Sequence, residues 1–288
     1  MTRQPSNTPK IRLLALDADG TLVDPNGSIQ PQVQQAVARA REAGIHVVIC
    51  TGRRYRTTRP LIDELGLTGP VILHNGVLVK DAQSGQTTAD RFLPEELFAP
   101  AMEMLRGVSP PLVYVDRYFD DVDLFAEPFE RCHDFQEEYL AANPDVVKVV
   151  DSVSHAPSDA VVMLSVMADG PQLLRLQRHV EDEFGASVQT NYIMNKNYRG
   201  HILEVTRGGT SKWTTLRQQA EGLGIAPDEI AAIGDDTNDT EMIAEAGVGI
   251  AMGNAVDEVK AAANWQTESN QDAGVALAID RLLESNGS

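Results

Sequence analysis

Residues 11–21 of this chain read IRLLALDADGT, and this stretch decides the fold. The apolar residues before Asp17 predict a strand that is covered on both faces, which is typical of parallel sheets flanked by helices. Ligands bind at the carboxyl ends of such strands, so we expect chemistry at Asp17 and Asp19, with Gly20 turning the backbone behind them. Two carboxylates this close imply a nearby cation if both are ionised. An isolated Asp-x-Asp is more often a simple turn after a strand.

The composition limits the classes of protein to be considered. A chain of 288 residues with 42% hydrophobic content predicts two domains, at about 150 residues per domain. The formal net charge of −18 disfavours nucleic acid and anionic membranes as partners. Cys50 and Cys132 form no metal-type pair and favour a reducing, cytoplasmic location. Residues 1–10 are expected to form a loose polar tail rather than a signal peptide, and no apolar run approaches the roughly 18 residues of a membrane span.

Beyond the first strand, helical and strand patterns alternate. Helical periodicity covers residues 31–43 and 55–65, and apolar strand patterns cover residues 45–50 and 71–73. This alternation predicts an α/β fold with a right-handed, doubly wound parallel sheet. The same pattern resumes later in the chain, with predicted strands at residues 202–205, 230–233 and 248–251.

The pattern changes in the middle of the chain. Between about residues 81 and 200, strand-like runs and helices occur without glycine loops of the phosphate-binding type. We therefore expect an inserted α+β domain over residues 84–200, which interrupts a catalytic core made of residues 1–83 and 201–288. The turn around Gly85 is the expected exit from the core.

Further polar groups follow the predicted core strands or begin core helices. Thr51 and Gly52 end the second strand, where a hydroxyl and backbone N–H groups could bind an anion, although a threonine at such a position, taken alone, is more often the cap of the next helix. Lys212 begins a helix, where a cation is disfavoured unless an anion offsets it, and the alternative is a solvated surface lysine.

The third group is the stretch GDDTND at residues 234–239, which follows an apolar strand and contains three carboxylates. Hard oxygen ligands in this number suit Mg²⁺. Acidic residues also cap helices, and we assign Asp236 to that structural role.

These motifs, in this order and each on a strand-end loop, resemble those of the haloacid dehalogenase superfamily. They are Asp17-x-Asp19-Gly20-Thr21, Thr51-Gly52-Arg53, Lys212 and Gly234-Asp235-x-x-Asn238-Asp239. The approach Thr210-Ser211-Lys212 and the turn Asn75-Gly76 are similar to the Cof-type sugar phosphatase branch, whose inserted α/β cap matches the interruption. Ala18 departs from the bulkier apolar residue that is frequent between the two aspartates, and we expect no loss of activity from it.

The resemblance implies a Mg²⁺-dependent phosphomonoester hydrolase. Asp17 would be the nucleophile that forms an aspartyl-phosphate, and Asp19 would be the general acid and base. Mg²⁺ would be held by Asp17, the backbone carbonyl of Asp19 and Asp235, with Asp239 bound directly or through water. The implied substrate is a small phosphorylated metabolite, with sugar phosphates expected, and the implied assembly is a monomer or homodimer.

Substrate contacts follow from the same resemblance. Thr51 and Lys212 would hold the phosphoryl oxygens, and Asn238 would orient Lys212 or the metal's surroundings. The full set of implied substrate-binding residues is Thr51, Gly52, Arg53, Asn75, Lys212 and Asn238.

The inserted domain would choose the leaving group. Candidates are the segment 191–199, with Asn195, Lys196, Asn197 and Arg199, for which a solvated loop is the simpler explanation, and the cluster Tyr114, Asp116, Arg117 and Tyr118, which a half-buried strand end explains equally well. His74 is the one histidine near the expected site. Two other functions stay open, a phosphotransferase of phosphomannomutase type and a non-catalytic cation-binding module.

Overall fold

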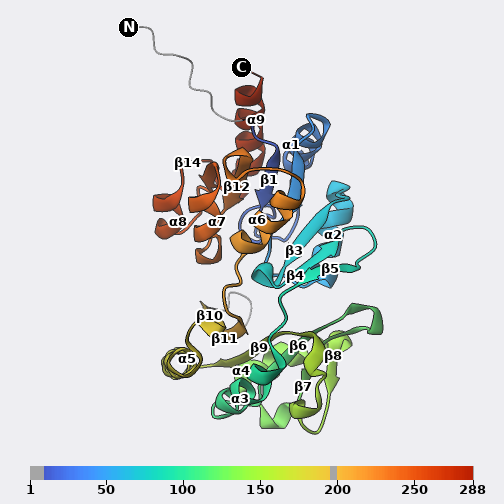
Figure 1. Ribbon diagram of the computed structural model, residues 1–288, viewed down its shortest axis with the longest axis vertical. Coiled ribbons are helices and arrows are strands. Elements are labelled where there is room, and N and C mark those ends of the chain that lie inside the picture. The colour runs from blue at the N-terminus through green and yellow to red at the C-terminus, as the bar shows by residue number, and fades with distance from the viewer. Residues whose placement is uncertain (1–9, 195–199, 288) are drawn as a thin grey trace. The chain divides into compact units, whose positions relative to one another are not determined.

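The computed structural model describes residues 10–194 and 200–287, and the chain divides into two compact units (Figure 1). The core unit comprises Met1–Ala89 and Ser211–Ser288, and the inserted unit comprises Asp90–Thr210. The boundaries therefore lie after Ala89 and Thr210, later along the chain than the predicted positions 83 and 200.

The core unit contains a five-stranded sheet in the order β14–β13–β12–β1–β2, with every neighbouring pair parallel. The strands are β1 (Leu13–Leu16), β2 (His46–Ile49), β12 (Ile230–Gly234), β13 (Val248–Ala251) and β14 (Trp265–Gln266). All four residues of β1 are buried, as the continuous apolar run predicts. The chain winds outward in one direction from β1 and in the other from β12, so these two neighbours form the switch point at which ligands bind in such sheets.

Helices flank this sheet and complete the predicted α/β fold (Figure 1). Helix α1 packs against α9, and α7 packs on β12 and β13 beside α6 and α8. Their bounds are α1 (Pro31–Glu42), α2 (Tyr55–Leu65), α6 (Lys212–Gly222), α7 (Thr240–Glu245), α8 (Asp257–Ala262) and α9 (Gly274–Asn286). The apolar residues of α1 recur at helical spacing and are all buried: Val33, Ala36, Val37 and Ala40.

A second, three-stranded sheet in the order β3–β4–β5 follows α2. Its strands are β3 (Pro70–Leu73), β4 (Leu78–Asp81) and β5 (Thr87–Asp90). Strand β3 pairs antiparallel with β4 and lies beside β2, where a parallel bridge joins Cys50 to Ile72. Residues 71–73 therefore lie next to β2 at the edge of the doubly wound sheet, but their continuous strand pairing is with β4.

The inserted unit is built on a six-stranded sheet in the order β10–β11–β9–β6–β7–β8. Helices α3 and α5 enclose its hydrophobic core, which contains Phe98, Leu164, Leu173 and Leu203. The elements are α3 (Glu95–Arg106), β6 (Leu112–Arg117), β7 (Val122–Ala126), α4 (Asp134–Ala141), β8 (Val147–Val149), β9 (Val161–Ala168), α5 (Gly170–Phe184), β10 (Val188–Met194) and β11 (His201–Arg207).

One strand was assigned to the wrong unit. Residues 202–205 were expected to resume the doubly wound core, but they lie in β11, which pairs antiparallel with β9 and β10. An apolar run identifies a strand without identifying its partner. The partner β10 escaped prediction because only Val188 of its residues is buried, so its sequence lacks a continuous apolar signal.

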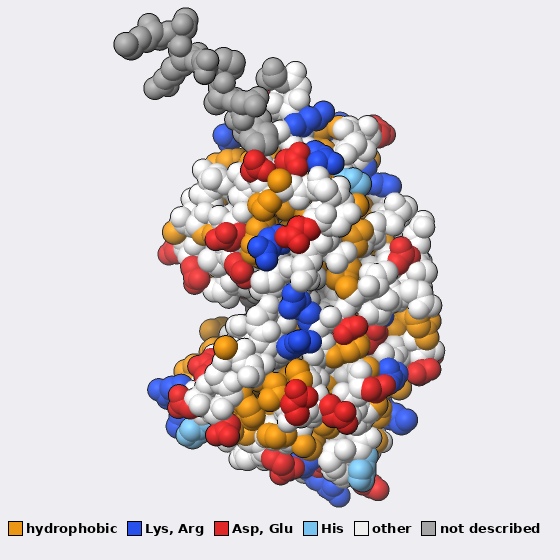
Figure 2. Space-filling view, viewed as in Figure 1, with side chains coloured by type: hydrophobic (Ala, Val, Ile, Leu, Met, Phe, Trp, Pro, Cys, Tyr) orange, Lys and Arg blue, Asp and Glu red, His pale blue; other side chains and the backbone are white. Residues whose placement is uncertain are grey.

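On the face drawn in Figure 2, the acidic side chains are not gathered in one place. Figure 2 shows Asp and Glu side chains scattered over the visible face among basic and apolar side chains. Among the described residues, no helix has both the length and the apolar character that crossing a membrane requires.

Candidate active site

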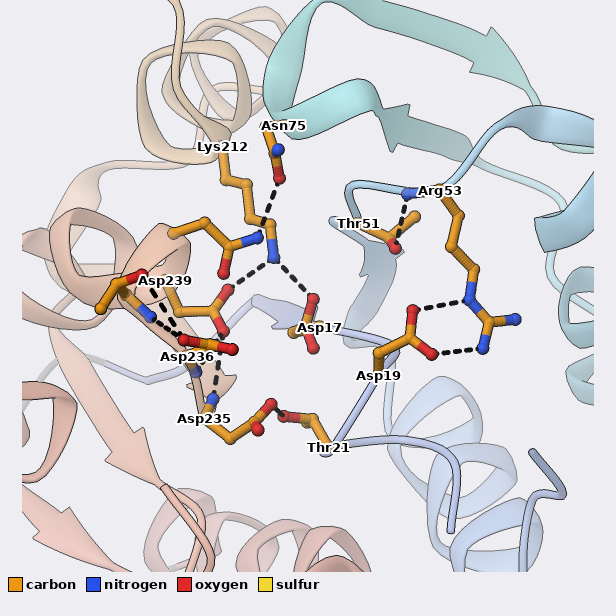
Figure 3. Close-up of polar contacts among 12 residues, drawn as sticks. Asp17, Asp19, Thr21, Thr51, Arg53, Asn75, Lys212, Asp235, Asp236 and Asp239 are labelled. Atoms are coloured by element: carbon orange, nitrogen blue, oxygen red, sulfur yellow. Dashed lines mark hydrogen bonds and ion pairs between the residues drawn. The ribbon is translucent and has the colours of Figure 1, made fainter. Parts of the chain in front are cut away.

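The carboxyl ends of the core strands bring three predicted residues together (Figure 3). Asp17 follows β1 and Asp235 follows the neighbouring strand β12, with Asp17 N donating to Ile233 O at 3.0 Å. Thr51 follows β2, and its backbone N donates to Ile72 O at 2.9 Å. Asp17, Thr51 and Asp235 are all buried, so the site contains polar groups that are surrounded largely by apolar side chains.

Lys212 lies at the centre of this site. Its Nζ is 2.6 Å from Asp17 Oδ1 and 2.7 Å from Asp239 Oδ1, and its side chain is fully buried. Helix α6 begins here because Ser211 and Thr214 form a capping box. A solvated surface lysine is therefore excluded, and the anions that offset a cation at a helix start are these two carboxylates.

The ion pairs govern protonation in the cluster. Burial disfavours the charge on Lys212, but Asp17 and Asp239 outweigh burial and raise the pKa of the ammonium. Burial and the negative charges of Asp239 and Asp235 raise the pKa of Asp17, which Lys212 partly opposes. The cluster thus holds more negative charge than Lys212 alone can balance.

Carboxylate oxygens of Asp17, Asp235 and Asp239 lie within 4.8 Å of one another, which makes this trio a candidate cation site. Asp235 Oδ1 accepts a hydrogen bond from Thr21 Oγ1 at 3.0 Å. Gly20 packs against the same carboxylate, because a Cβ there would lie 2.1 Å from Asp235 Oδ2, and its φ of +85° also favours glycine.

Both oxygens of Asp239 are already engaged. Oδ1 accepts from Lys212, and Oδ2 accepts from the backbone N–H groups of Asp235 at 3.1 Å and Asp236 at 3.2 Å. Asp236 caps the following turn, since its side chain accepts from Thr237 N at 2.8 Å, as predicted. Asp239 therefore fixes both the loop and the lysine.

Thr51 does not cap the helix that follows it. Helix α2 begins at Tyr55 with Arg54 as its N-cap, and Thr51 Oγ1 accepts instead from Arg53 N at 3.1 Å. The Arg53 side chain forms a two-pronged ion pair with Asp19, with distances of 2.7 Å from Nε and 2.5 Å from Nη2 (Figure 3). Sequence reasoning expected Arg53 to contact substrate and did not foresee this pair. The Asp19 side chain is 64% exposed.

The turn at His74–Gly76 joins the Thr51 loop to the Asp235 loop. Asn238 Nδ2 donates to Asn75 Oδ1 at 2.9 Å, so the described partner of Asn238 is Asn75 rather than Lys212. His74, Asn75 and Gly76 all have positive φ. Thr215 Oγ1 donates to Gly76 O at 2.7 Å, and a Cβ at Gly76 would lie 2.2 Å from Ser211 O. The turn is therefore docked against the start of the helix that carries Lys212.

The other candidates lie in the inserted unit or outside the described residues. Tyr114 OH pairs with Tyr139 OH at 2.9 Å, and Arg117 pairs with Asp159 at 2.8 Å. Asn191 lies half-buried on β10. Asp116 and Tyr118 lie at and just beyond the end of β6, whereas Asn195, Lys196, Asn197 and Arg199 lie outside the described residues.

One residue near the site was missed. Asn254, in the loop after β13, donates from Nδ2 to Gly20 O at 2.8 Å and to Asp235 Oδ2 at 3.5 Å. The available signal was its position beyond a predicted core strand, because every such loop reaches the same edge of the sheet.

Comparisons with known proteins agree with this geometry. The model of the haloacid dehalogenase-like hydrolase family matches residues 14–279. The chain is 31% identical to YxeH of Bacillus subtilis strain 168, covering 94% of this chain and 98% of that protein. It is 29% identical to pyridoxal phosphate phosphatase YbhA of Escherichia coli K12, covering 93% and 97% of the two chains. A haloacid dehalogenase-like hydrolase from Bacteroides thetaiotaomicron has a similar structure, with a TM-score of 0.79, 27% identity and coverage of 95% and 100%. The chain therefore belongs to the haloacid dehalogenase-like hydrolases and is an enzyme of that family.

Proposed function

We propose that this enzyme is a Mg²⁺-dependent phosphatase that hydrolyses small phosphorylated metabolites through an aspartyl-phosphate on Asp17. The observation that carries the proposal is the buried Asp17 carboxylate, held 2.6 Å from Lys212 at the switch point of the sheet. The relative YbhA is named a pyridoxal phosphate phosphatase, and YwtE of Bacillus subtilis strain 168, which is 27% identical, is named a phosphatase of a ribitylaminouracil phosphate.

Asp17 is placed to act as the nucleophile. Lys212 is hydrogen-bonded to its Oδ1, and Oδ2 accepts no hydrogen bond from the part of the chain that the structure describes. In the first step an Asp17 oxygen attacks phosphorus and the bond from phosphorus to the leaving oxygen breaks. In the second step water attacks the same phosphorus, and the bond to Asp17 breaks to restore the carboxylate and release phosphate. Lys212 would stabilise the negative charge on the phosphoryl oxygens in both steps.

Asp19 would supply the proton transfers. It would donate a proton to the leaving alkoxide and then accept one from the attacking water. The two hydrogen bonds from Arg53 hold the Asp19 carboxyl group, and its largely exposed side chain has room to turn toward a leaving group. Arg53 would thus hold the acid and base of the reaction, rather than contact substrate alone.

The donor set fits Mg²⁺. We assign Asp17, Asp235 and the backbone carbonyl of Asp19 as direct ligands, because hard oxygen donors suit this ion. Asp239 is assigned a contact through water, since both its oxygens already accept hydrogen bonds from Lys212 and the loop backbone. When bound, Mg²⁺ supplies positive charge that offsets the repulsion between Asp17 and the phosphate.

A non-catalytic cation-binding module fits the site less well. Such a module gains nothing from a buried ammonium that competes with the cation for Asp17 and Asp239. A phosphotransferase would use the same aspartyl-phosphate, so it must be separated by experiment. The phosphorylated metabolites of the relatives support a small phosphate ester, and we expect sugar phosphates among the substrates.

The test is a screen of phosphorylated metabolites for release of free phosphate, with Mg²⁺ and with excess chelator. We expect release that chelation abolishes and Mg²⁺ restores, with Asp235→Asn needing far more Mg²⁺. Full activity in excess chelator would contradict the metal site. Transfer of the phosphoryl group to a sugar, without free phosphate, would favour the phosphotransferase.

A second experiment tests the intermediate. With excess enzyme, one turnover in ¹⁸O-water should place the label in released phosphate, because water attacks phosphorus. Label in the Asp17 carboxylate would mean that water attacked its carbonyl carbon, and the aspartyl-phosphate mechanism would have to be abandoned.

A further inference from the structure

Asn254 is an exposed side chain with an unusually complete set of hydrogen bonds. Its Nδ2 donates to Gly20 O at 2.8 Å and lies 3.5 Å from Asp235 Oδ2, while its Oδ1 accepts from Asn270 N at 2.9 Å. Exposure means that the side chain contributes little to the hydrophobic core. Asn254, in the loop after β13, instead connects the loops that follow β1, β12 and β14.

The contacts of Asn254 complete the support of Asp235. Thr21 donates to Oδ1 of this carboxylate from one side, and Asn254 approaches Oδ2 from the other. A carboxylate that is held through both oxygens keeps one orientation about its terminal torsion. Groups that orient metal ligands in this way commonly contribute 10–100-fold to metal affinity, as an order of magnitude.

Asn254 also fixes the backbone beside the other proposed ligand. The Gly20 carbonyl that it binds belongs to the residue directly after Asp19, at the point where φ is +85°. Glycine is the residue with the greatest backbone freedom, so a hydrogen bond to its carbonyl removes motion that would otherwise move the Asp19 carbonyl. A single carboxamide therefore acts on two positions assigned to the metal.

We propose that Asn254 is a positioning residue for the Mg²⁺ site, which holds Asp235 and the backbone after Asp19 in their metal-binding arrangement. This inference depends on the metal site in the proposed function. It predicts a defect in metal binding rather than in folding, and the chain offers a matched control for that distinction.

The control is Asn270, which belongs to the same network of loops. Its Nδ2 donates to Val23 O at 2.8 Å, a hydrogen bond that involves neither Asp235 nor Gly20. Asn270→Ala removes the hydrogen bond to Val23 O but keeps the backbone N–H of residue 270, which donates to Asn254 Oδ1. If Asn254 only stiffened the loops, the two substitutions would have similar effects.

The experiment titrates Mg²⁺ alone into the wild-type protein and into Asn254→Ala, Asn254→Ser, Asn270→Ala and Asp235→Asn, by calorimetry without substrate. We expect a 10–100-fold weaker Kd for the Asn254 variants and a change of less than about threefold for Asn270→Ala. In steady-state assays kcat of the Asn254 variants should recover at saturating Mg²⁺, with KM for substrate unchanged. Circular dichroism checks that each variant is folded, and either folded Asn254 variant decides the question.

The outcomes separate the two proposals. Absence of Mg²⁺ binding by the wild-type protein would overturn the proposed metal site and this inference with it. Wild-type binding that Asp235→Asn weakens but both Asn254 variants retain would overturn the inference alone. Equal weakening by Asn254→Ala and Asn270→Ala would also overturn it, because the effect would then belong to the loops in general.

Discussion

Each unit of this enzyme buries charged side chains, and the two clusters are balanced differently. In the inserted unit, Glu127 is paired with Arg106 at 2.7 Å and accepts from Val153 N at 3.2 Å, with Arg131 3.8 Å away. These groups lower the pKa of Glu127 against the effect of burial, so its charge is compensated within the protein. In the core unit, Asp17 and Asp239 share the ammonium of Lys212, and the carboxylate of Asp235 lies beside them.

The two ion pairs differ in how completely the buried negative charge is compensated. A buried charge is costly unless it is paired, and Glu127 meets that requirement with its own neighbours. The Asp17 cluster does not, because burial and its neighbouring carboxylates raise the pKa of Asp17. An uncompensated cluster at a strand-end edge is where a cation and a phosphate would bind.

The largest expected effect is that of Asp17→Asn. The substitution removes the proposed nucleophile while keeping the shape of the side chain, so kcat should fall by about 10⁴-fold or more. The measurement is phosphate release at saturating Mg²⁺, with circular dichroism to show that the fold is retained. Turnover within a few-fold of wild type would remove Asp17 from the mechanism.

Lys212→Met should lower kcat by about 10²–10³-fold, because it removes the ammonium that would stabilise the phosphoryl charge. The matched control is Lys80→Met. Lys80 is also buried in the core unit, but it donates to Gly85 O and Thr87 Oγ1, away from the cluster. We expect Lys80→Met to lower thermal stability with kcat nearly unchanged. A similar loss of kcat in both variants would mean that the loss comes from removing any buried lysine of the core unit, and not from the position of Lys212 in the carboxylate cluster.

How much of this could be predicted depends on what each pattern encodes. Helix α2 was predicted with its observed bounds, because its apolar residues recur at helical spacing. The positions of Asp17, Asp235 and Lys212 at one edge also followed, since strand ends and helix starts of a parallel sheet meet there.

Other features depend on tertiary contacts that local patterns do not encode. Strand β11 was placed in the wrong unit because its partner β10 has only one buried residue, Val188, and no continuous apolar run. The pairing of Arg53 with Asp19 joins two loops that are distant in the sequence, and a lone Asn254 carries no motif. Such residues become visible only when the loops are brought together.

Breaking the ion pair of the inserted unit should lower the stability of the protein and leave its activity unchanged. Arg106→Met leaves Glu127 buried with weaker compensation, so the free energy of unfolding should fall by about 1–3 kcal/mol. Urea unfolding measures this change, and phosphate release on a small artificial ester should be unaffected by it in the folded protein. Loss of activity without loss of stability would contradict the assignment of the Arg106–Glu127 pair to a structural role.

The smallest expected effect concerns Glu204 on β11, a half-buried carboxyl whose pKa burial raises from 4.5 to about 7. Because the folded protein then holds this proton more tightly than the unfolded chain, the stability contributed by Glu204 falls as pH rises from about 4.5 to about 7. Glu204→Gln mimics the neutral form, and solvent screens the half-buried charge in part, so the substitution should raise the free energy of unfolding by about 1 kcal/mol at pH 8 and by much less at pH 5. Urea unfolding at the two pH values measures the difference, and Glu183→Gln, at an exposed position of α5, is the control. A gain in the free energy of unfolding that is the same at both pH values would show that ionising Glu204 does not destabilise the fold. The carboxylate of Glu204 would then be compensated within the inserted unit, in contrast to the Asp17 cluster of the core unit.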